Sequence, residues 1–232
     1  MTEFSAIKGI GFDLDGTLAD SVPDLAVACD AALKQFNLEG CTEAQVRHWV
    51  GNGARVLVQR ALQSVMASPS EALITEVLAA FECHYQATNN RGSRLYPGVA
   101  DTLAVLARRG YKMAVITNKP MQFVPELLES LGIAHYFSQC LGGDSLAEKK
   151  PSPQPLQHVM GQWQLPASAF LMVGDSRNDI LAAEAAGVVS VGLSYGYNYG
   201  EDIRLSQPTL ALDHFETLLA HLPARTEEST RV

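Results

Sequence analysis

Residues 7–17 read IKGIGFDLDGT, a short apolar run that ends in the turn signal Asp15-Gly16. Such a run is typical of a strand, so we expect a strand over Ile7–Leu14. Asp13 and Asp15 then lie at the carboxyl end of this strand. In open α/β sheets ligands bind beyond the carboxyl ends of the strands, which makes these two aspartates the first candidates for a functional site.

A different pattern follows over residues 22–88, where the sequence is typical of helices and contains no convincing strand. Thr42 begins a capping box, and Ser68 begins a second one with Pro69 at the first helical position. The polar stretch at residues 88–93 is typical of a linker. We therefore expect an all-helical insertion after the first strand.

Strands and helices alternate after Pro97. Helices of about ten residues separate the strand-like runs at residues 112–117, near 140–141, and at 170–173 and 188–193. This alternation indicates right-handed βαβ units and a parallel, doubly wound sheet. We predict a Rossmann-like α/β core with an inserted all-helical cap domain. The expected boundaries are 1–20 and 91–224 for the core, 21–90 for the cap and 225–232 for a flexible tail.

The composition of the 232 residues, 47% hydrophobic and 18% charged, provides a substantial core and excludes global disorder. The formal net charge is −8 and the basic residues are scattered, which argues against nucleic acid or a membrane surface as partner. No apolar run approaches the roughly 18 residues of a spanning helix, and the N-terminal residues lack a secretory signal. The four cysteines lie far apart. We expect a soluble cytoplasmic protein, as a monomer or homodimer.

Polar side chains follow the expected strands at one edge of the predicted sheet. They are Asp13 and Asp15, Thr117 and Asn118, Lys150, and Asp175 and Asp179. Packing explains this set poorly, because a buried carboxylate without partners costs several kcal/mol. The set therefore predicts an active site.

These residues, in this order, resemble the haloacid dehalogenase-like superfamily of phosphohydrolases. The matching motifs are Asp13–Thr17, Thr117, Lys150 before a proline, and Gly174–Asp179. The resemblance spans residues 7–193, and the helical insertion lies where that superfamily carries its first type of cap domain. Longer strings, among them Gly51-Asn52-Gly53 and residues 96–98, are similar to those of the phosphoglycolate phosphatases in this superfamily.

The resemblance implies a phosphatase that works through an aspartyl-phosphate. Asp13 would be the nucleophile, because a carboxylate can accept a phosphoryl group that water later removes. Asp13, the main-chain carbonyl of Asp15, and Asp175 would hold Mg²⁺, which prefers oxygen ligands. The ion would cancel the repulsion between Asp13 and the incoming phosphate of a small phosphomonoester.

The resemblance also implies a phosphate site. Thr117 and Asn118 would hold the phosphoryl oxygens, Lys150 would add positive charge, and Asp179 would orient Lys150 or a metal-bound water. In the cap, Arg55 could bind a substrate carboxylate, although a solvated arginine in the first turn of a helix is an equally good interpretation.

A charge count suggests the role of Asp15. The aspartates of the set contribute −4; they are Asp13, Asp15, Asp175 and Asp179. Mg²⁺ with Lys150 contributes +3, which leaves −1 before the phosphate enters. A proton on Asp15 would remove the excess, and Asp15 would then give it to the leaving group as general acid.

The substrate is open at the level of sequence. 2-Phosphoglycolate is favoured by the longer strings, and another small sugar phosphate is the alternative. A phosphosugar mutase similar to β-phosphoglucomutases would use the same aspartyl-phosphate. A silent binding module on the same fold is less favoured, because Asp13, Asp15, Lys150 and Asp175 are all present.

Overall fold

The computed structural model describes residues 4–224, so the tail predicted at 225–232 lies outside the described residues. The core is a parallel six-stranded sheet in the order β5-β4-β1-β6-β7-β8. Its strands are β1 (Gly9–Phe12), β4 (Lys112–Ile116), β5 (Gln139–Leu141), β6 (Phe170–Gly174), β7 (Val189–Leu193) and β8 (Leu210–Leu212). This architecture confirms the predicted doubly wound α/β fold.

Strand β1 lies in the middle of the sheet, where the strand order reverses direction. Gly9 pairs with Lys112 of β4 on one side and with Phe170 of β6 on the other. All four residues of β1 are buried. The strand is shorter than the predicted run Ile7–Leu14, because only these four residues pair with both neighbours. Ligand sites in such sheets lie at this point of reversal, beyond the carboxyl ends.

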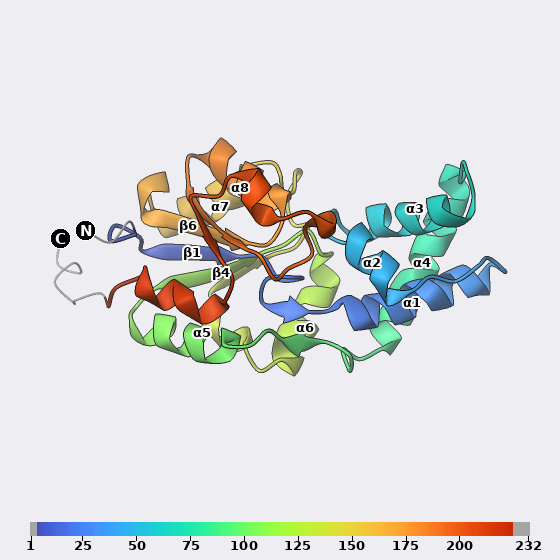
Figure 1. Cartoon of the computed structure of the whole chain (residues 1–232), viewed down its shortest axis with the longest axis horizontal. Coiled ribbons are helices and arrows are strands. Elements are labelled where there is room, and N and C mark those ends of the chain that lie inside the picture. Colours follow the sequence, from blue (N-terminus) through green and yellow to red (C-terminus); the bar gives the residue numbers. More distant parts are fainter. Residues whose placement is uncertain (1–3, 225–232) are drawn as a thin grey trace.

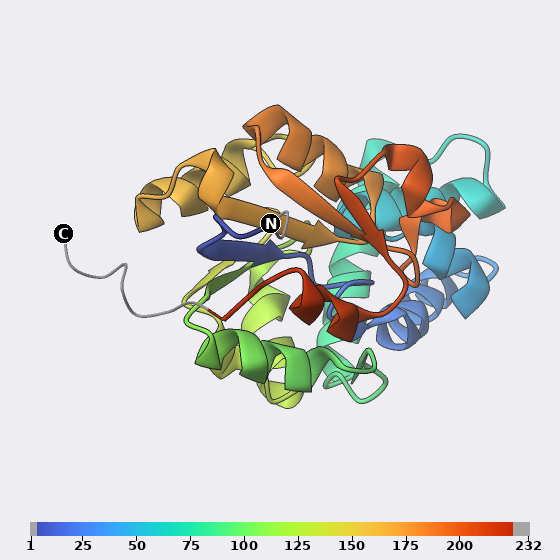
Figure 2. The same ribbon diagram turned by 60° about the vertical axis from the view of Figure 1, so that its left-hand side comes forward.

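Helices cover both faces of the sheet and make three layers (Figures 1 and 2). On one face, α5 (Val99–Arg108) and α6 (Val124–Ser130) contribute to an apolar cluster that includes the side chain of Phe12. On the other face, α7 (Gln154–Trp163) and α8 (Arg177–Ala186) pack around Phe170.

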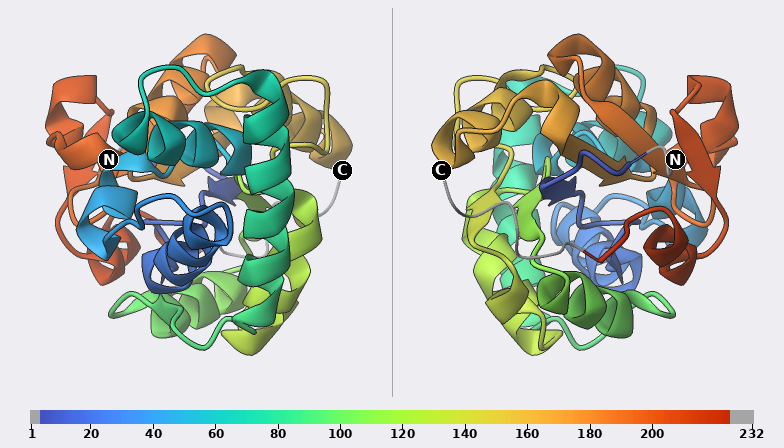
Figure 3. Two further views of the ribbon diagram at one scale, coloured as in Figure 1. Left: turned by 90° about the vertical axis from the view of Figure 1, so that its right-hand side faces the viewer. Right: turned by 90° about the vertical axis from the view of Figure 1, so that its left-hand side faces the viewer.

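A second group of helices lies beyond the carboxyl ends of the strands, at the right of Figure 1. It consists of α1 (Val22–Gln35), α2 (Glu43–Trp49), α3 (Ala54–Val65) and α4 (Glu71–Ala87). These helices share an apolar cluster that is separate from those of the sheet, and α1 packs along α4. Figure 3 shows them gathered at one end of the molecule.

The capping box predicted at Thr42 is present: its side chain accepts from the Gln45 amide, and the Gln45 side chain accepts from the Thr42 amide. The one predicted at Ser68 is wrong. Ser70 is the N-cap of α4, where its hydroxyl accepts a hydrogen bond from the Leu73 amide, so Pro69 precedes the helix. Ser70 lies directly before the first helical residue and satisfies the free amide of the first turn, so Ser68 is not needed as the N-cap.

The helical group joins the sheet through two short antiparallel strands that the sequence did not predict, β2 (Ala19–Asp20) and β3 (Arg94–Leu95). Next to them, the buried carboxylate of Asp24 accepts hydrogen bonds from the amides of Gly92 and Ser93. The segment that leads into the helical group and the segment that leads out of it are therefore joined by hydrogen bonds. None of the described helices is long and apolar enough to cross a membrane.

Candidate active site

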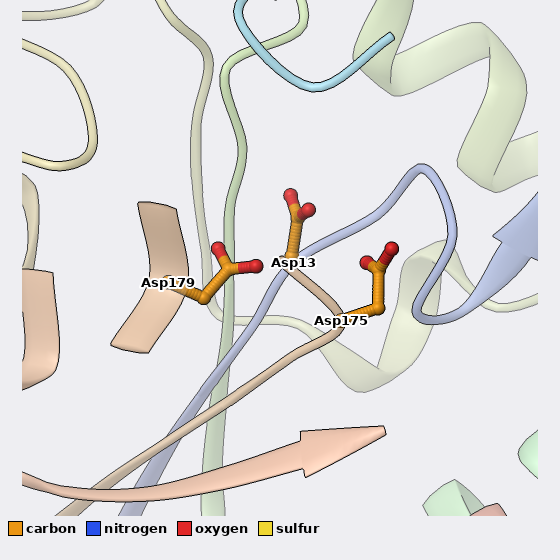
Figure 4. A group of neighbouring side chains, drawn as sticks. All are labelled: Asp13, Asp175 and Asp179. Atoms are coloured by element: carbon orange, nitrogen blue, oxygen red, sulfur yellow. The ribbon is translucent and has the colours of Figure 1, made fainter. Parts of the chain in front are cut away.

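Three buried aspartates meet at the carboxyl ends of β1 and β6 (Figure 4). Asp13 follows β1, Asp175 follows β6, and Asp179 lies in the first turn of α8. One carboxylate oxygen from each lies within 4.8 Å of the others. The structure therefore brings Asp13 next to two residues that lie more than 160 positions further along the sequence.

Lys150 lies among these carboxylates, with only 2% of its side chain exposed. Its Nζ is 3.0 Å from Asp13 Oδ1 and 2.5 Å from Asp179 Oδ1. The other oxygen of Asp179 accepts hydrogen bonds from the amide and hydroxyl of Ser176, the N-cap of α8. Burial opposes the charge of Lys150, but Asp13 and Asp179 raise its pKa above the usual value, so it stays a cation. Asp179 thereby orients Lys150 towards Asp13.

Negative charge at the strand ends exceeds what Lys150 balances. Burial raises the pKa of Asp13 to about 6; Lys150 lowers this pKa and Asp179 raises it. Burial also raises the pKa of Asp175 well above its usual range, and Asp13 and Asp179 add to the effect. Asp13 Oδ1 is buried, and its ion-pair partner among the described residues, Lys150, is shared with Asp179. A divalent cation among these oxygens would supply the missing positive charge, and the all-oxygen donor set suits a hard ion.

Asp175 is held in one orientation from two sides. Its Oδ1 accepts a hydrogen bond from Thr17 Oγ1 at 2.7 Å, and its Oδ2 accepts one from the Tyr197 amide at 2.8 Å. Gly16, at φ +93°, and Gly196 pack directly against this carboxylate, where a Cβ atom would collide with it. Glycine at position 16 therefore allows both the positive φ of the turn after β1 and the close approach of the Asp175 carboxylate to the backbone.

Asp15 has a cationic partner that sequence reasoning missed. Its Oδ1 accepts hydrogen bonds from Ser21 Oγ at 2.5 Å and from Lys119 Nζ at 3.2 Å. The Lys119 side chain is 3% exposed; burial opposes its charge, but Asp15 and Tyr85 raise the pKa of Lys119. The available signal was a lysine two residues beyond the strand-end Thr117.

Lys119 corrects the charge count made from the sequence. With this second buried lysine, two lysines and one Mg²⁺ ion would balance the four aspartates, and no excess of −1 would be left. The count alone therefore no longer requires a proton on Asp15 before substrate binds. Two negative charges enter with a phosphate dianion, and the demand for a proton on Asp15 arises only at that stage.

The end of β4 contributes Thr117 and Asn118. Thr117 Oγ1 accepts from the Lys119 amide at 3.2 Å, which leaves the hydroxyl proton for a ligand. Asn118 Nδ2 donates to the carbonyls of Gly51 and Lys150, at 3.0 and 2.9 Å. Because both contacts use the amide protons of Asn118, its side chain ties the loop at Gly51 to the residues at the strand ends.

A cavity opens in front of Asp13 and Asp15, between the sheet and the helices of the insertion. Its polar end is formed by Asp13, Asp15, Thr117, Asn118 and Lys119, and its remaining side chains are mainly apolar. Arg55 is not among the described residues that line it. The guanidinium of Arg55 pairs with Glu71 of α4, and 46% of its side chain is exposed.

The family model described as haloacid dehalogenase-like hydrolase matches residues 10–193. The chain belongs to this family. It is 52% identical over 219 residues to the phosphoglycolate phosphatase of Pectobacterium atrosepticum, with 94% of each chain covered. It is 51% identical over 216 residues to that of Vibrio vulnificus, with 92% of this chain and 95% of the relative covered.

A crystal structure of a predicted phosphoglycolate phosphatase from Haemophilus somnus superposes with a TM-score of 0.90. The two chains are 44% identical, and the match covers 93% of this chain and 98% of the other. Together the matches confirm the resemblance drawn from the motifs, and they confirm the prediction of a phosphoric monoester hydrolase.

Proposed function

We propose that this phosphatase hydrolyses 2-phosphoglycolate to glycolate and inorganic phosphate, with Mg²⁺ as cofactor. The observation that carries the proposal is the buried cluster of Asp13, Asp175, Asp179 and Lys150 at the ends of adjacent strands. The names of the relatives that match over nearly the whole chain support the choice of substrate.

Asp13, the main-chain carbonyl of Asp15, and Asp175 would hold the magnesium ion. The raised pKa values of Asp13 and Asp175 support this set, as does the sharing of Lys150 between Asp13 and Asp179. When bound, Mg²⁺ supplies positive charge that lets an anionic carboxylate approach an anionic phosphate.

In the first step, Asp13 would attack phosphorus, the bond from phosphorus to the substrate oxygen would break, and Asp15 would protonate the leaving oxygen. Thr117 would donate its hydroxyl proton to a phosphoryl oxygen, and Lys150 would balance charge on the other side. In the second step, Asp15 would take a proton from water, which attacks the aspartyl-phosphate and frees Asp13.

We also propose that the chain divides as the sequence suggests, into a core at 1–20 and 91–224 and a cap at 21–90. The cap would close over the site and exclude water during the reaction. The separate apolar cluster of the inserted helices and the hydrogen bonds between the Gly51 carbonyl and the core support this division.

A panel of phosphomonoesters tests the proposal, with inorganic phosphate release as the readout. Glycolate, hexose, aminosugar and nucleotide phosphates are compared in Mg²⁺, in EDTA, and in EDTA with Mg²⁺ restored. We expect the highest kcat/KM for 2-phosphoglycolate, no activity in EDTA, full recovery with Mg²⁺ and inhibition by Ca²⁺, whose looser coordination spoils in-line geometry.

Full activity in excess chelator would overturn the metal assignment. A higher kcat/KM for a hexose phosphate would favour the sugar phosphatase alternative. Isomerisation of a sugar phosphate with little phosphate release would favour a mutase. A cytoplasmic location and a monomeric or homodimeric state stay predictions from the sequence, and light scattering on the eluting protein measures the second.

A further inference from the structure

Lys119 is a buried cation at the point where Asp15 meets the cavity. Its Nζ lies 3.2 Å from Asp15 Oδ1 and 3.4 Å from Oδ2, and it also lies 4.5 Å from the centre of the Tyr85 ring. Among the described residues that line the cavity, it is the one with a positive charge. A ligand in the cavity therefore meets this ammonium group beyond the phosphate site.

Tyr85 lies beside Lys119 in the cavity wall. Its side chain comes from α4 of the insertion, lines the cavity and is almost completely buried, with 3% of the residue exposed. The hydroxyl oxygen of Tyr85 is buried beside Lys119, which lowers the pKa of Tyr85 against the larger effect of burial, and it has no other hydrogen-bond partner among the described residues. A ligand in the cavity can complete the hydrogen bonding of this buried hydroxyl.

Most other side chains that line the cavity are apolar. They include Leu25, Val50, Leu57, Phe81 and Phe123. Apolar walls exclude water and strengthen the attraction between an ammonium group and an anion. The apolar wall and the single ammonium group together suit a small ligand group with one negative charge and no further polar atoms.

The position of the anion follows from the chemistry of the leaving group. Asp15 must lie within hydrogen-bond distance of the leaving oxygen to protonate it. In 2-phosphoglycolate one methylene group separates that oxygen from the carboxylate. Because Lys119 contacts Asp15 directly, a carboxylate one carbon beyond the leaving oxygen comes within reach of Lys119 as well.

We propose that Lys119, with the Tyr85 hydroxyl, binds the substrate's carboxylate and makes the enzyme selective for phosphomonoesters with a carboxylate one carbon from the leaving oxygen. This inference rests on the proposed function. It replaces Arg55 as the group that recognises the carboxylate, since Arg55 pairs with Glu71 outside the cavity lining. It makes Lys119 and Tyr85 specificity-determining residues, contributed by the core and by the insertion respectively.

The test compares 2-phosphoglycolate with its carboxamide, which has nearly the same size and leaving group but no charge. Lys119→Met should lower the ratio of the two kcat/KM values by roughly 10- to 100-fold, the loss expected for a charge-assisted hydrogen bond. Tyr85→Phe should lower the same ratio by roughly 3- to 10-fold. Lys119→Arg should retain most of the selectivity, and Lys34→Met, at an exposed lysine of α1, should leave it unchanged.

A binding measurement keeps the test independent of turnover, because Lys119 also contacts the proposed acid Asp15. In the Mg²⁺-loaded enzyme, Lys119→Met should raise the dissociation constant of 3-phosphonopropionate by roughly 10-fold or more. This compound is the analogue of the substrate in which a methylene group replaces the leaving oxygen. Propylphosphonate, which lacks the carboxylate, should bind the variant and the wild type alike.

An equal loss for the acid and the amide, together with unchanged preference for 3-phosphonopropionate, would overturn the inference and leave Lys119 as a partner of Asp15 only. A loss of selectivity in Arg55→Met but not in Lys119→Met would also overturn it. These outcomes are distinct from failure of the proposed function, in which the wild type itself hydrolyses 2-phosphoglycolate poorly and another phosphomonoester well.

Discussion

Asp13→Asn should stabilise the metal-free protein at neutral pH, although it removes the proposed nucleophile. Burial is the main reason that the pKa of Asp13 rises from 3.8 to about 6. A shift of this size corresponds to about 3 kcal/mol. The folded protein holds the Asp13 proton more tightly than the unfolded chain does. The free energy of unfolding therefore falls as pH rises from about 4 to about 6, and the full cost is present above that range.

The neutral amide of Asn avoids this cost. In EDTA at about pH 7.5, Asp13→Asn should be more stable than the wild type by up to about 3 kcal/mol, or roughly 6–12 °C in Tm. The value is an upper limit because Lys150 loses one of its two carboxylate partners and keeps Asp179. Mg²⁺ should raise the Tm of the wild type, since it binds the folded state, and should raise that of the variant much less.

Urea unfolding at about pH 4.5 and pH 7.5, in EDTA and in Mg²⁺, measures these differences. Asp101→Asn, at an exposed position in the first turn of α5, is the matched control and should lower stability by no more than about 1 kcal/mol. The reasoning is refuted if Asp13→Asn is less stable than the wild type at pH 7.5 in EDTA, or if Mg²⁺ stabilises both proteins equally.

Three further predictions concern the same site. Asp15→Asn should slow the first step severely for alkyl phosphates and much less for p-nitrophenyl phosphate, whose leaving group needs no proton; equal losses in single-turnover reactions would exclude Asp15 as general acid. Asn178→Ala removes a hydrogen bond from the core to the cap loop, so KM should rise more than kcat falls, and an unchanged KM would contradict this. Gly196→Ala should abolish Mg²⁺-induced stabilisation by displacing Asp175, whereas Gly161→Ala, which meets open space, should be tolerated.

The sequence predicted the parts of the site that follow directly from strands. The apolar run before Asp13 ends in a turn signal, and the strand before Asp175 has the same form. Because all strands of a parallel sheet end at one edge, their terminal residues must converge, whatever the details of packing. The core and the aspartate cluster could therefore be placed without knowledge of any contact.

Contacts between the inserted helices and the α/β core could not be predicted in this way. The bond from Asn178 to the Gly51 carbonyl joins residues 127 positions apart, and no local pattern marks it. Strands β2 and β3 have two residues each, too few to show a period. The glycine-rich break before Arg55 makes it a candidate ligand in the sequence, but the direction of its side chain depends on Glu71 of another helix. The role of Lys119 could not be predicted either, because it depends on the contact between its ammonium group and Asp15, which only the structure shows.

Trapping the phosphoenzyme tests the central claim most directly. The Mg²⁺-loaded enzyme is mixed with 2-phosphoglycolate, quenched in acid within one turnover, digested and analysed by mass spectrometry. We expect one phosphoryl group on the peptide that contains Asp13, formed as fast as glycolate is released, and none in Asp13→Asn. Release of glycolate and phosphate without a phosphorylated Asp13, or the same adduct in Asp13→Asn, would contradict the account.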